Sequence, residues 1–160
     1  MDNDFSKALN FFQKGRLVEA KNLVEEVLNN EKNNTQALNL YAFVLYYQNN
    51  FNAALEQWQK AIKINPNYIE AYNGCGNAYK NLEKFEEAVQ SFKKAIQIEP
   101  RYFEAQINLG SVLIKLERFE DAIKNFDKVT DVENIAAQAF QGKAYSFMKL
   151  KKYEEAIYNF

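Results

Sequence analysis

An internal repeat with a step of 34 residues constrains the fold of this chain more than any other feature. The step is clearest for alanine, which returns at one position of every copy with no insertion between copies. The aligned columns are Ala20, Ala54, Ala88, Ala122, Ala156; Leu17, Phe51, Phe85, Phe119, Tyr153; Val24, Trp58, Phe92, Phe126, Phe160; Phe11, Leu45, Tyr79, Leu113, Phe147; and Ala8, Ala42, Gly76, Gly110, Ala144. Such a chain stacks copies of one structural unit.

Each copy carries two apolar stripes with helical spacing. Tyr72, Cys75, Gly76 and Tyr79 follow the i, i+3, i+4, i+7 pattern of a half-buried helix. The second stripe consists of Phe85, Ala88, Val89, Phe92, Ala95 and Ile96. A short polar connection, residues 81–84, separates the two stripes and suits an antiparallel helix pair. The sequence therefore predicts a helix-turn-helix hairpin in every copy.

The repeats set the expected domain organisation. Pro66 and Pro100 stand at equivalent places and should end the second helix of their repeats, whereas Asn134 occupies this place in the fourth repeat. We expect one domain over residues 1–160, with four full repeats and a partial fifth. The predicted repeats are 1–34, 35–68, 69–102, 103–136 and 137–160. The last is unfinished and shows no polar capping element, so we expect the native chain to continue past residue 160.

Composition excludes several classes of function. Lys plus Arg number 20 and Asp plus Glu number 21, so no global field attracts nucleic acid or an anionic membrane. No apolar run approaches the roughly 20 residues that span a bilayer, and the first residues do not resemble a secretory signal. Cys75 is the single cysteine and cannot form an internal disulfide. These features predict a cytoplasmic protein.

Catalytic and metal-binding signals are nearly absent. The chain has no histidine, which removes the usual general base, the commonest metal ligand and every Ser-His or Cys-His pair. Cys75 lies on a core stripe and is expected to be buried packing. Adjacent carboxylates such as Glu86 and Glu87 point in different directions on a helix. We expect no enzyme activity, no metal and no cofactor.

The third repeat resembles the tetratricopeptide pattern of aromatic, Leu-Gly, Tyr, Ala, Phe, Ala and Pro. Its matching residues are Tyr72, Cys75, Gly76, Tyr79, Ala88, Phe92, Ala95 and Pro100. The resemblance covers the whole chain, although the first repeat departs from the pattern at several places. It implies an all-α, right-handed α-solenoid of antiparallel helix pairs. It also implies a non-catalytic module that binds a peptide or protein on the concave surface lined by the first helix of each repeat.

The candidate binding residues lie on the first helices, opposite the core stripe. They form an amide-rich surface with an aromatic cluster at one end, where apolar anchors of a peptide could pack. The predicted peptide-binding residues are Asn39, Phe43, Tyr46, Tyr47, Asn73, Asn77, Lys80, Asn108, Ser111 and Tyr145. Side-chain amides can both donate to and accept from a peptide backbone, so the surface suits an extended peptide.

Some tetratricopeptide proteins hold a peptide's C-terminal carboxylate with two asparagines and several basic residues. Asn77 and Asn108 match the asparagine places of that clamp. Asn73, Gln138 and Gly142 stand where the clamp has lysine, lysine and arginine, so the charge-assisted bonds are missing. The resemblance therefore does not extend to binding chaperone C-terminal tails.

Other interpretations remain open at this stage. Asparagines on exposed helix faces often only face solvent, and neighbouring repeats could bury the aromatic cluster of Phe43, Tyr46 and Tyr47. An uncapped repeat end could pair with another copy, which would make the chain a self-assembling scaffold and a homo-oligomer. The repeats could also belong to a longer enzyme, such as a glycosyltransferase.

Overall fold

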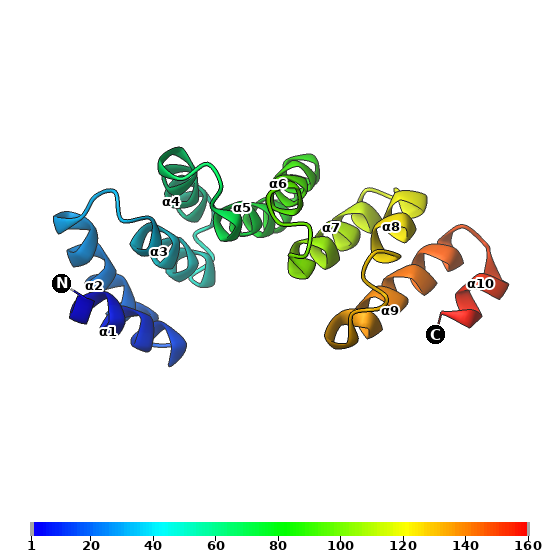
Figure 1. Ribbon diagram of the computed structural model, residues 1–160, viewed down its shortest axis with the longest axis horizontal. Helices are drawn as coiled ribbons and strands as arrows, with labels where there is room; N and C mark the ends of the chain where they lie inside the picture. Colours follow the sequence, from blue (N-terminus) through cyan, green and yellow to red (C-terminus); the bar gives the residue numbers. More distant parts are fainter. Residues whose placement is uncertain (1, 160) are drawn as a thin grey trace. The chain divides into compact units, whose positions relative to one another are not determined.

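The computed structural model describes residues 2–159, which form ten α-helices and no strand (Figure 1). The helices are α1 (Asp2–Gln13), α2 (Leu17–Asn30), α3 (Thr35–Tyr47), α4 (Phe51–Ile64), α5 (Ile69–Asn81), α6 (Phe85–Ile98), α7 (Phe103–Lys115), α8 (Phe119–Phe126), α9 (Glu133–Lys149) and α10 (Tyr153–Tyr158). The all-α prediction is confirmed. None of the described helices is long and apolar enough to cross a bilayer.

The chain divides into two compact units, which are described separately. The N-terminal unit is Met1–Leu82 and holds α1 to α5, and the C-terminal unit is Glu83–Phe160 and holds α6 to α10. The third repeat thus contributes one helix to each unit. The expectation of a single domain over residues 1–160 stays a prediction.

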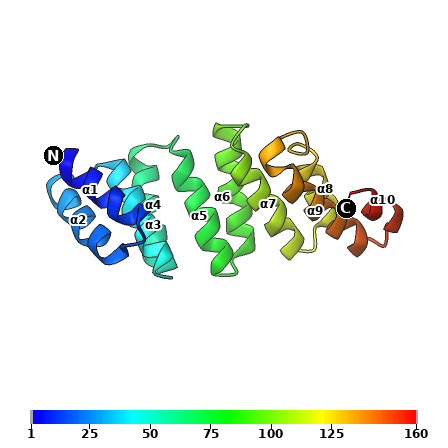
Figure 2. The same ribbon diagram turned by 90° about the horizontal axis from the view of Figure 1, so that it is seen from below.

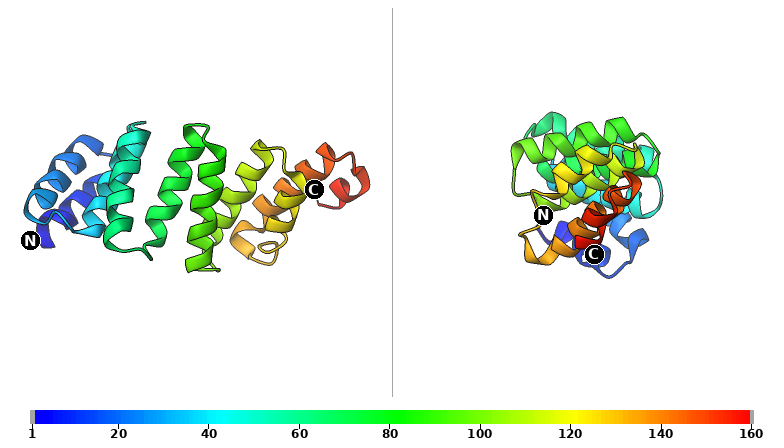
Figure 3. Two further views of the ribbon diagram at one scale, coloured as in Figure 1. Left: turned by 90° about the horizontal axis from the view of Figure 1, so that it is seen from above. Right: turned by 90° about the vertical axis from the view of Figure 1, so that its right-hand side faces the viewer.

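Helix starts follow the repeat register. The first helices α3, α5 and α7 begin at Thr35, Ile69 and Phe103, one repeat apart. The second helices keep the same step from α2 to α10. Within the N-terminal unit α1 packs on α2 and α3 packs on α4, as Figure 2 shows for the second pair. Within the C-terminal unit α7 packs on α8, and α10 folds back against α9 (Figure 3). The predicted hairpins of the first, second, fourth and fifth repeats are confirmed.

Backbone hydrogen bonds close the hairpin turns. After α3, the amide of Asn49 donates to the carbonyl of Tyr46 and the amide of Asn50 donates to that of Leu45, both at 2.9 Å. This is the Schellman arrangement, which requires a left-handed residue after the helix. Asn49 has a φ of 61°. Equivalent residues with φ between 57° and 72° are Gly15, Glu83, Glu117 and Lys151.

Trp58 of α4 is the largest fully buried side chain of the N-terminal unit. It packs with Ala54, Ala61 and Ala71, and Gly74 of α5 makes room for its ring. A Cβ atom at Gly74 would lie 2.3 Å from Cε2 of Trp58. Because that distance is far below van der Waals contact, α5 can cover the indole only with glycine there.

Phe126 of α8 has the corresponding place in the C-terminal unit. Its ring would lie 2.4 Å from a Cβ atom at Gly110 of α7 and also 2.4 Å from one at Gly142 of α9. One aromatic side chain therefore packs against the backbones of two first helices. The small-residue column found in the sequence accounts for Gly110, whereas Gly142 belongs to the predicted binding face.

The end of the fourth repeat departs from the register. The second helix α8 ends at Phe126, although α2, α4 and α6 each continue for 14 residues. Residues 127–131 form turns, and α9 begins at Glu133, before the predicted repeat boundary at residue 137. Asp127, Val129 and Thr130 have low helix propensity, and Asn134 allows a helix where proline stands in two other repeats.

Candidate functional site

A groove lies between α7 and α9, the first helices of the fourth and fifth repeats. Its volume is about 420 Å³. The lining residues are Ile107, Ser111, Ile114, Phe126, Gln138, Gln141, Gly142 and Tyr145. Seven of them come from α7 and α9, and Phe126 reaches the groove from α8. Because Gly142 has no side chain, its backbone packs directly on the ring of Phe126, which is 2% exposed and lies beneath the groove. This surface is an apolar trough with amide and hydroxyl groups on its walls.

Two of the predicted binding residues, Ser111 and Tyr145, line this groove. Ser111 is half-buried, and Tyr145 is exposed. The ammonium group of Lys149 lies 5.4 Å from the centroid of the Tyr145 ring, within the range of a cation–π interaction. Asn108, also on α7, is half-buried but does not line the groove.

An aromatic cluster occupies the first helices of the N-terminal unit. Tyr47 is 60% exposed, and its ring centroid lies 5.6 Å from those of Phe12 and Tyr46. Phe43 packs edge-on against Trp58 at 5.3 Å and is half-buried. The cluster therefore has a buried base and one exposed ring. Contacts within the unit account for most of the aromatic surface that the sequence assigned to peptide binding.

Tyr46 is tied into the unit by its hydroxyl group. The side-chain amide of Asn81 donates to that oxygen at 2.8 Å and to the carbonyl of Asn77 at 2.9 Å. Burial raises the pKa of Tyr46 above its ordinary value, and the hydrogen bond from Asn81 acts in the opposite direction. The hydroxyl group is thus neutral at physiological pH and links α3 to α5.

Two of the predicted amides are engaged inside the N-terminal unit. Oδ1 of Asn39 accepts a hydrogen bond of 2.8 Å from the indole nitrogen of Trp58, and the same side chain hydrogen-bonds with the hydroxyl of Tyr68. Asn73 is only 2% exposed. Asn73 is thus buried, and Asn39 is half-buried rather than fully exposed. Asn77 and Lys80 are half-buried on α5, and their binding role stays a prediction.

The groove also contains residues that were absent from the predicted set. Ile107 and Ile114 are apolar residues at surface positions of α7, spaced i and i+7 with Ser111 between them. That spacing was readable in the sequence as a second, exposed apolar stripe. The prediction instead followed the asparagines, which are frequent throughout the chain. Gln138 and Gln141 lie opposite the core stripe of the fifth repeat's first helix, on the face expected to continue that of Ile107 and Ile114, and both line the groove.

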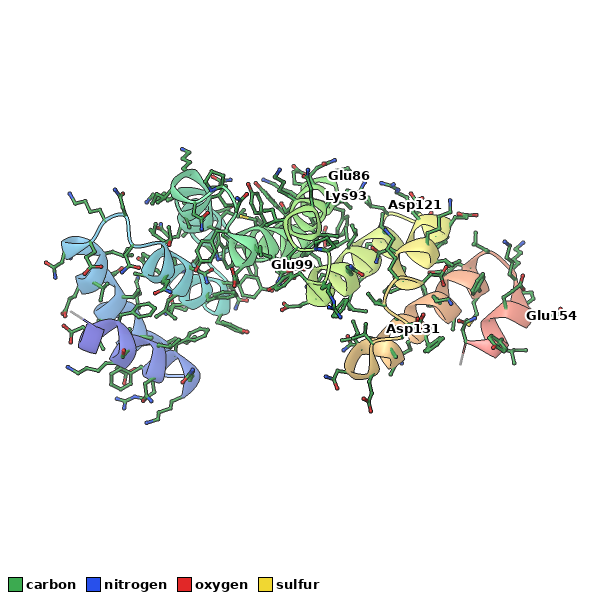
Figure 4. All side chains as sticks on the ribbon, in the orientation of Figure 1. Glu86, Lys93, Glu99, Asp121, Asp131 and Glu154 are labelled. Atoms are coloured by element: carbon green, nitrogen blue, oxygen red, sulfur yellow. The ribbon has the colours of Figure 1, made fainter. Side chains whose placement is uncertain are left out.

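Cys75, the single cysteine of the chain, is buried in the core of the N-terminal unit. Burial raises the pKa of the Cys75 thiol to about 12, so this cysteine is not a thiolate at physiological pH. The described residues hold no group of three or more potential metal ligands. Lys93 of α6 and Asp121 of α8 are charged residues of two second helices (Figure 4). A hydrogen bond from Arg118 lowers the pKa of Asp121, with smaller effects from nearby lysines.

The fold is similar to solved structures of other helical repeat proteins. A crystal structure of MamA has a TM-score of 0.88 at 22% identity, covering 96% of this chain and 90% of that chain. A MamA RS-1 ArsTM double mutant has a TM-score of 0.89 at 18% identity, covering 99% and 89%. TTC0263, a thermophilic tetratricopeptide protein of Thermus thermophilus, has a TM-score of 0.78 at 21% identity, covering 99% and 87%. No curated protein sequence gives a significant match.

Models of one repeat family match most of the chain. A TPR repeat model matches residues 43–83, and tetratricopeptide repeat models match residues 69–102 and 107–160. Repeats of this kind are typically non-catalytic interaction modules. The resemblance seen in the third repeat is confirmed by these matches and by the helix register. The chain belongs to the tetratricopeptide repeat family and is a protein-interaction repeat module.

Proposed function

We propose that the chain binds an extended segment of a partner protein in the groove between α7 and α9. The supporting observation is the groove itself, with an apolar floor at Phe126 and walls formed by both first helices. Burying an apolar side chain there would contribute about 25 cal/mol for each Å² removed from water. Ser111, Gln138 and Gln141 can donate to and accept from a peptide backbone.

The groove can be filled by one substitution that the repeat already tolerates. Ser111 is aligned with Phe43 of the second repeat and Tyr145 of the fifth, so a large ring at this position is compatible with the fold. Ser111→Tyr would place a ring in the trough without touching the core. Gln90→Tyr adds the same side chain at an exposed position of the second helix α6 and serves as the matched control.

The test selects random peptides displayed on phage with the 160-residue chain and measures the affinity of synthetic copies by fluorescence anisotropy. Ser111→Tyr should weaken a groove-bound peptide at least about tenfold, because it occupies the anchor position, and Gln90→Tyr should leave the affinity within about twofold. Circular dichroism should show all three proteins equally helical. Peptides that bind the Ser111→Tyr protein as well as the original would contradict the proposal.

Self-association is a second candidate, favoured by the exposed apolar face of α9 and α10. Ile157 is 75% exposed and Tyr158 is 89% exposed. A hollow of about 490 Å³ beside them is lined by Ala137, Gln138, Phe140, Gln141, Tyr158 and Asn159. Sedimentation equilibrium tests this candidate. A mass that rises with concentration, and that Ile157→Asp returns to the monomer value, would support it, and a constant monomer mass would reject it.

A further inference from the structure

The floor of the groove between α7 and α9 suits one large apolar side chain. Phe126 lies beneath the groove and is only 2% exposed, because the backbone of Gly142 packs directly on its ring; a Cβ atom at Gly142 would lie 2.4 Å from that ring. Ile107, Ile114 and Tyr145 form the apolar walls. Small or polar side chains would leave these apolar surfaces in contact with water, so the groove selects a bulky aliphatic or aromatic residue.

The C-terminal ends of the two first helices carry the charge at this groove. The eight lining residues are all uncharged. Lys115 is the last residue of α7 and follows Ile114, while Lys149 is the last residue of α9 and lies over the ring of Tyr145. Helices α7 and α9 run side by side in the same direction (Figure 1), so both lysines lie at one end of the groove.

The residues that follow these helices carry charges of both signs. Glu117 comes after α7, while Lys151 and Lys152 come after α9 and precede Glu154 and Glu155. The nearby Arg118 is paired with Asp121. At the other end, Gln138 and Gln141 offer uncharged amides. A bound segment therefore meets hydrogen-bonding groups, an apolar trough and a basic edge in that order along the helices.

We propose that the partner segment carries a bulky apolar anchor with one or more acidic residues beside it, which lie against Lys115 and Lys149. This inference rests on the proposed function and specifies its partner chemistry. The acidic side chains would form charge-assisted contacts at the solvent-exposed rim, where they guide binding and fix the direction of the peptide. The recognition differs from a terminal carboxylate clamp because the anchor is a side chain within the segment.

The test compares random heptapeptides displayed on phage that are selected by the original chain and by a Lys115→Glu plus Lys149→Glu variant. Only peptides whose binding is lost in Ser111→Tyr are counted, since these occupy the groove. We expect the original chain to enrich Asp or Glu within three residues of a bulky apolar residue. The charge-reversed variant should enrich Lys or Arg at those positions instead. Lys94→Glu, on the second helix α6, is the matched control and should select the acidic peptides.

Affinity measurements complete the design. The double charge reversal should weaken the best acidic peptide about tenfold at low salt, and the loss should shrink as ionic strength rises. Groove-dependent peptides without acidic enrichment, or with the same enrichment on both proteins, would overturn this inference and leave the proposed function standing. Peptides that none of the groove substitutions affect would reject both.

Discussion

The indole nitrogen of Trp58 donates a hydrogen bond of 2.8 Å to Oδ1 of Asn39, which lies 19 residues earlier in the chain. This bond joins the two helices of the second repeat, α3 and α4. It satisfies the one polar group of a side chain that is otherwise fully buried. Asn39 therefore supports the interior of the N-terminal unit, although its position opposite the core stripe suggested a binding residue.

Loss of the Asn39 side-chain amide should destabilise the chain, because the indole of Trp58 loses its hydrogen-bond partner. Asn39→Ala leaves the buried N–H group of Trp58 without its hydrogen-bond acceptor, and we expect the free energy of unfolding to fall by about 1–3 kcal/mol. In a Trp58→Phe background the same substitution should have a much smaller effect. Urea unfolding of the four proteins forms a double-mutant cycle. A coupling energy near zero would show that the hydrogen bond does not contribute.

Gly74 should be sensitive to the addition of one methyl group. Its missing Cβ atom would lie 2.3 Å from the Trp58 ring, so Gly74→Ala should destabilise by about 1–3 kcal/mol through overpacking. Trp58→Ala should cost about 3–5 kcal/mol because it opens a cavity. In a Trp58→Ala background, Gly74→Ala should lower the free energy of unfolding very little further. Additive losses in thermal or urea melts would argue against the close contact.

The left-handed residue of a hairpin turn offers a route to higher stability. Glu117 has a φ of 57° after α7, and Gly15 has a φ of 72° at the equivalent place after α1. Glycine adopts this conformation without the steric cost of a Cβ atom, so Glu117→Gly should stabilise by roughly 0.5–1 kcal/mol. Gly15→Ala should destabilise by a similar amount. Chemical denaturation measures both, and a destabilising Glu117→Gly would refute the expectation.

An ion pair secures the turn between α8 and α9. Nζ of Lys143 lies 2.7 Å from Oδ1 of Asp127, and the lysine side chain is 14% exposed while the aspartate is 52% exposed. Asp127→Ala should cost about 1–3 kcal/mol, because the largely buried ammonium loses its partner. Lys143→Met keeps the packing volume and removes the charge, so it should cost less. If urea unfolding gives the opposite order, the pair contributes mainly through the lysine.

Stability should fall at high pH through Tyr41. Burial, reinforced by the hydrogen bond from its hydroxyl group to Glu25, raises the pKa of Tyr41 from 10.0 to about 12. The folded state therefore favours the protonated phenol. The stabilisation is complete below pH 10 and is lost as pH rises from 10 towards 12. Tyr41→Phe should flatten this part of the stability profile, which urea melts at several pH values would measure; an unchanged profile would contradict the assignment.

The repeat pattern was sufficient to predict the fold where every local signal agreed. Pro66 and Pro100 follow α4 and α6 at the expected distance, and α3, α5 and α7 begin at the predicted repeat boundaries. At residues 127–136 the signals conflict, because poor helix formers come early and Asn134 replaces the proline. A single sequence cannot weigh such small preferences against packing, which is why the early start of α9 was missed.

The surroundings of the predicted site residues depend on contacts between helices, which helical spacing alone does not give. Ser111 and Tyr145, which were chosen by position along one helix, line the groove, and their binding role stays a prediction. Whether an amide is free depends on partners from other helices, as Asn39 shows with Trp58. The role of Gly142 likewise depends on Phe126 reaching it from α8. Such relationships between helices leave no local trace in the sequence.

The backbone closure of the hairpin turns has a consequence for how this chain can change over evolutionary time. Main-chain groups make both bonds of the turn after α3, so Asn49 needs only to accept a left-handed backbone. The residues found at this place, Gly, Asn, Glu and Lys, have little else in common. Each hairpin can therefore acquire new surface residues, and with them a new specificity, without a compensating substitution in its turn.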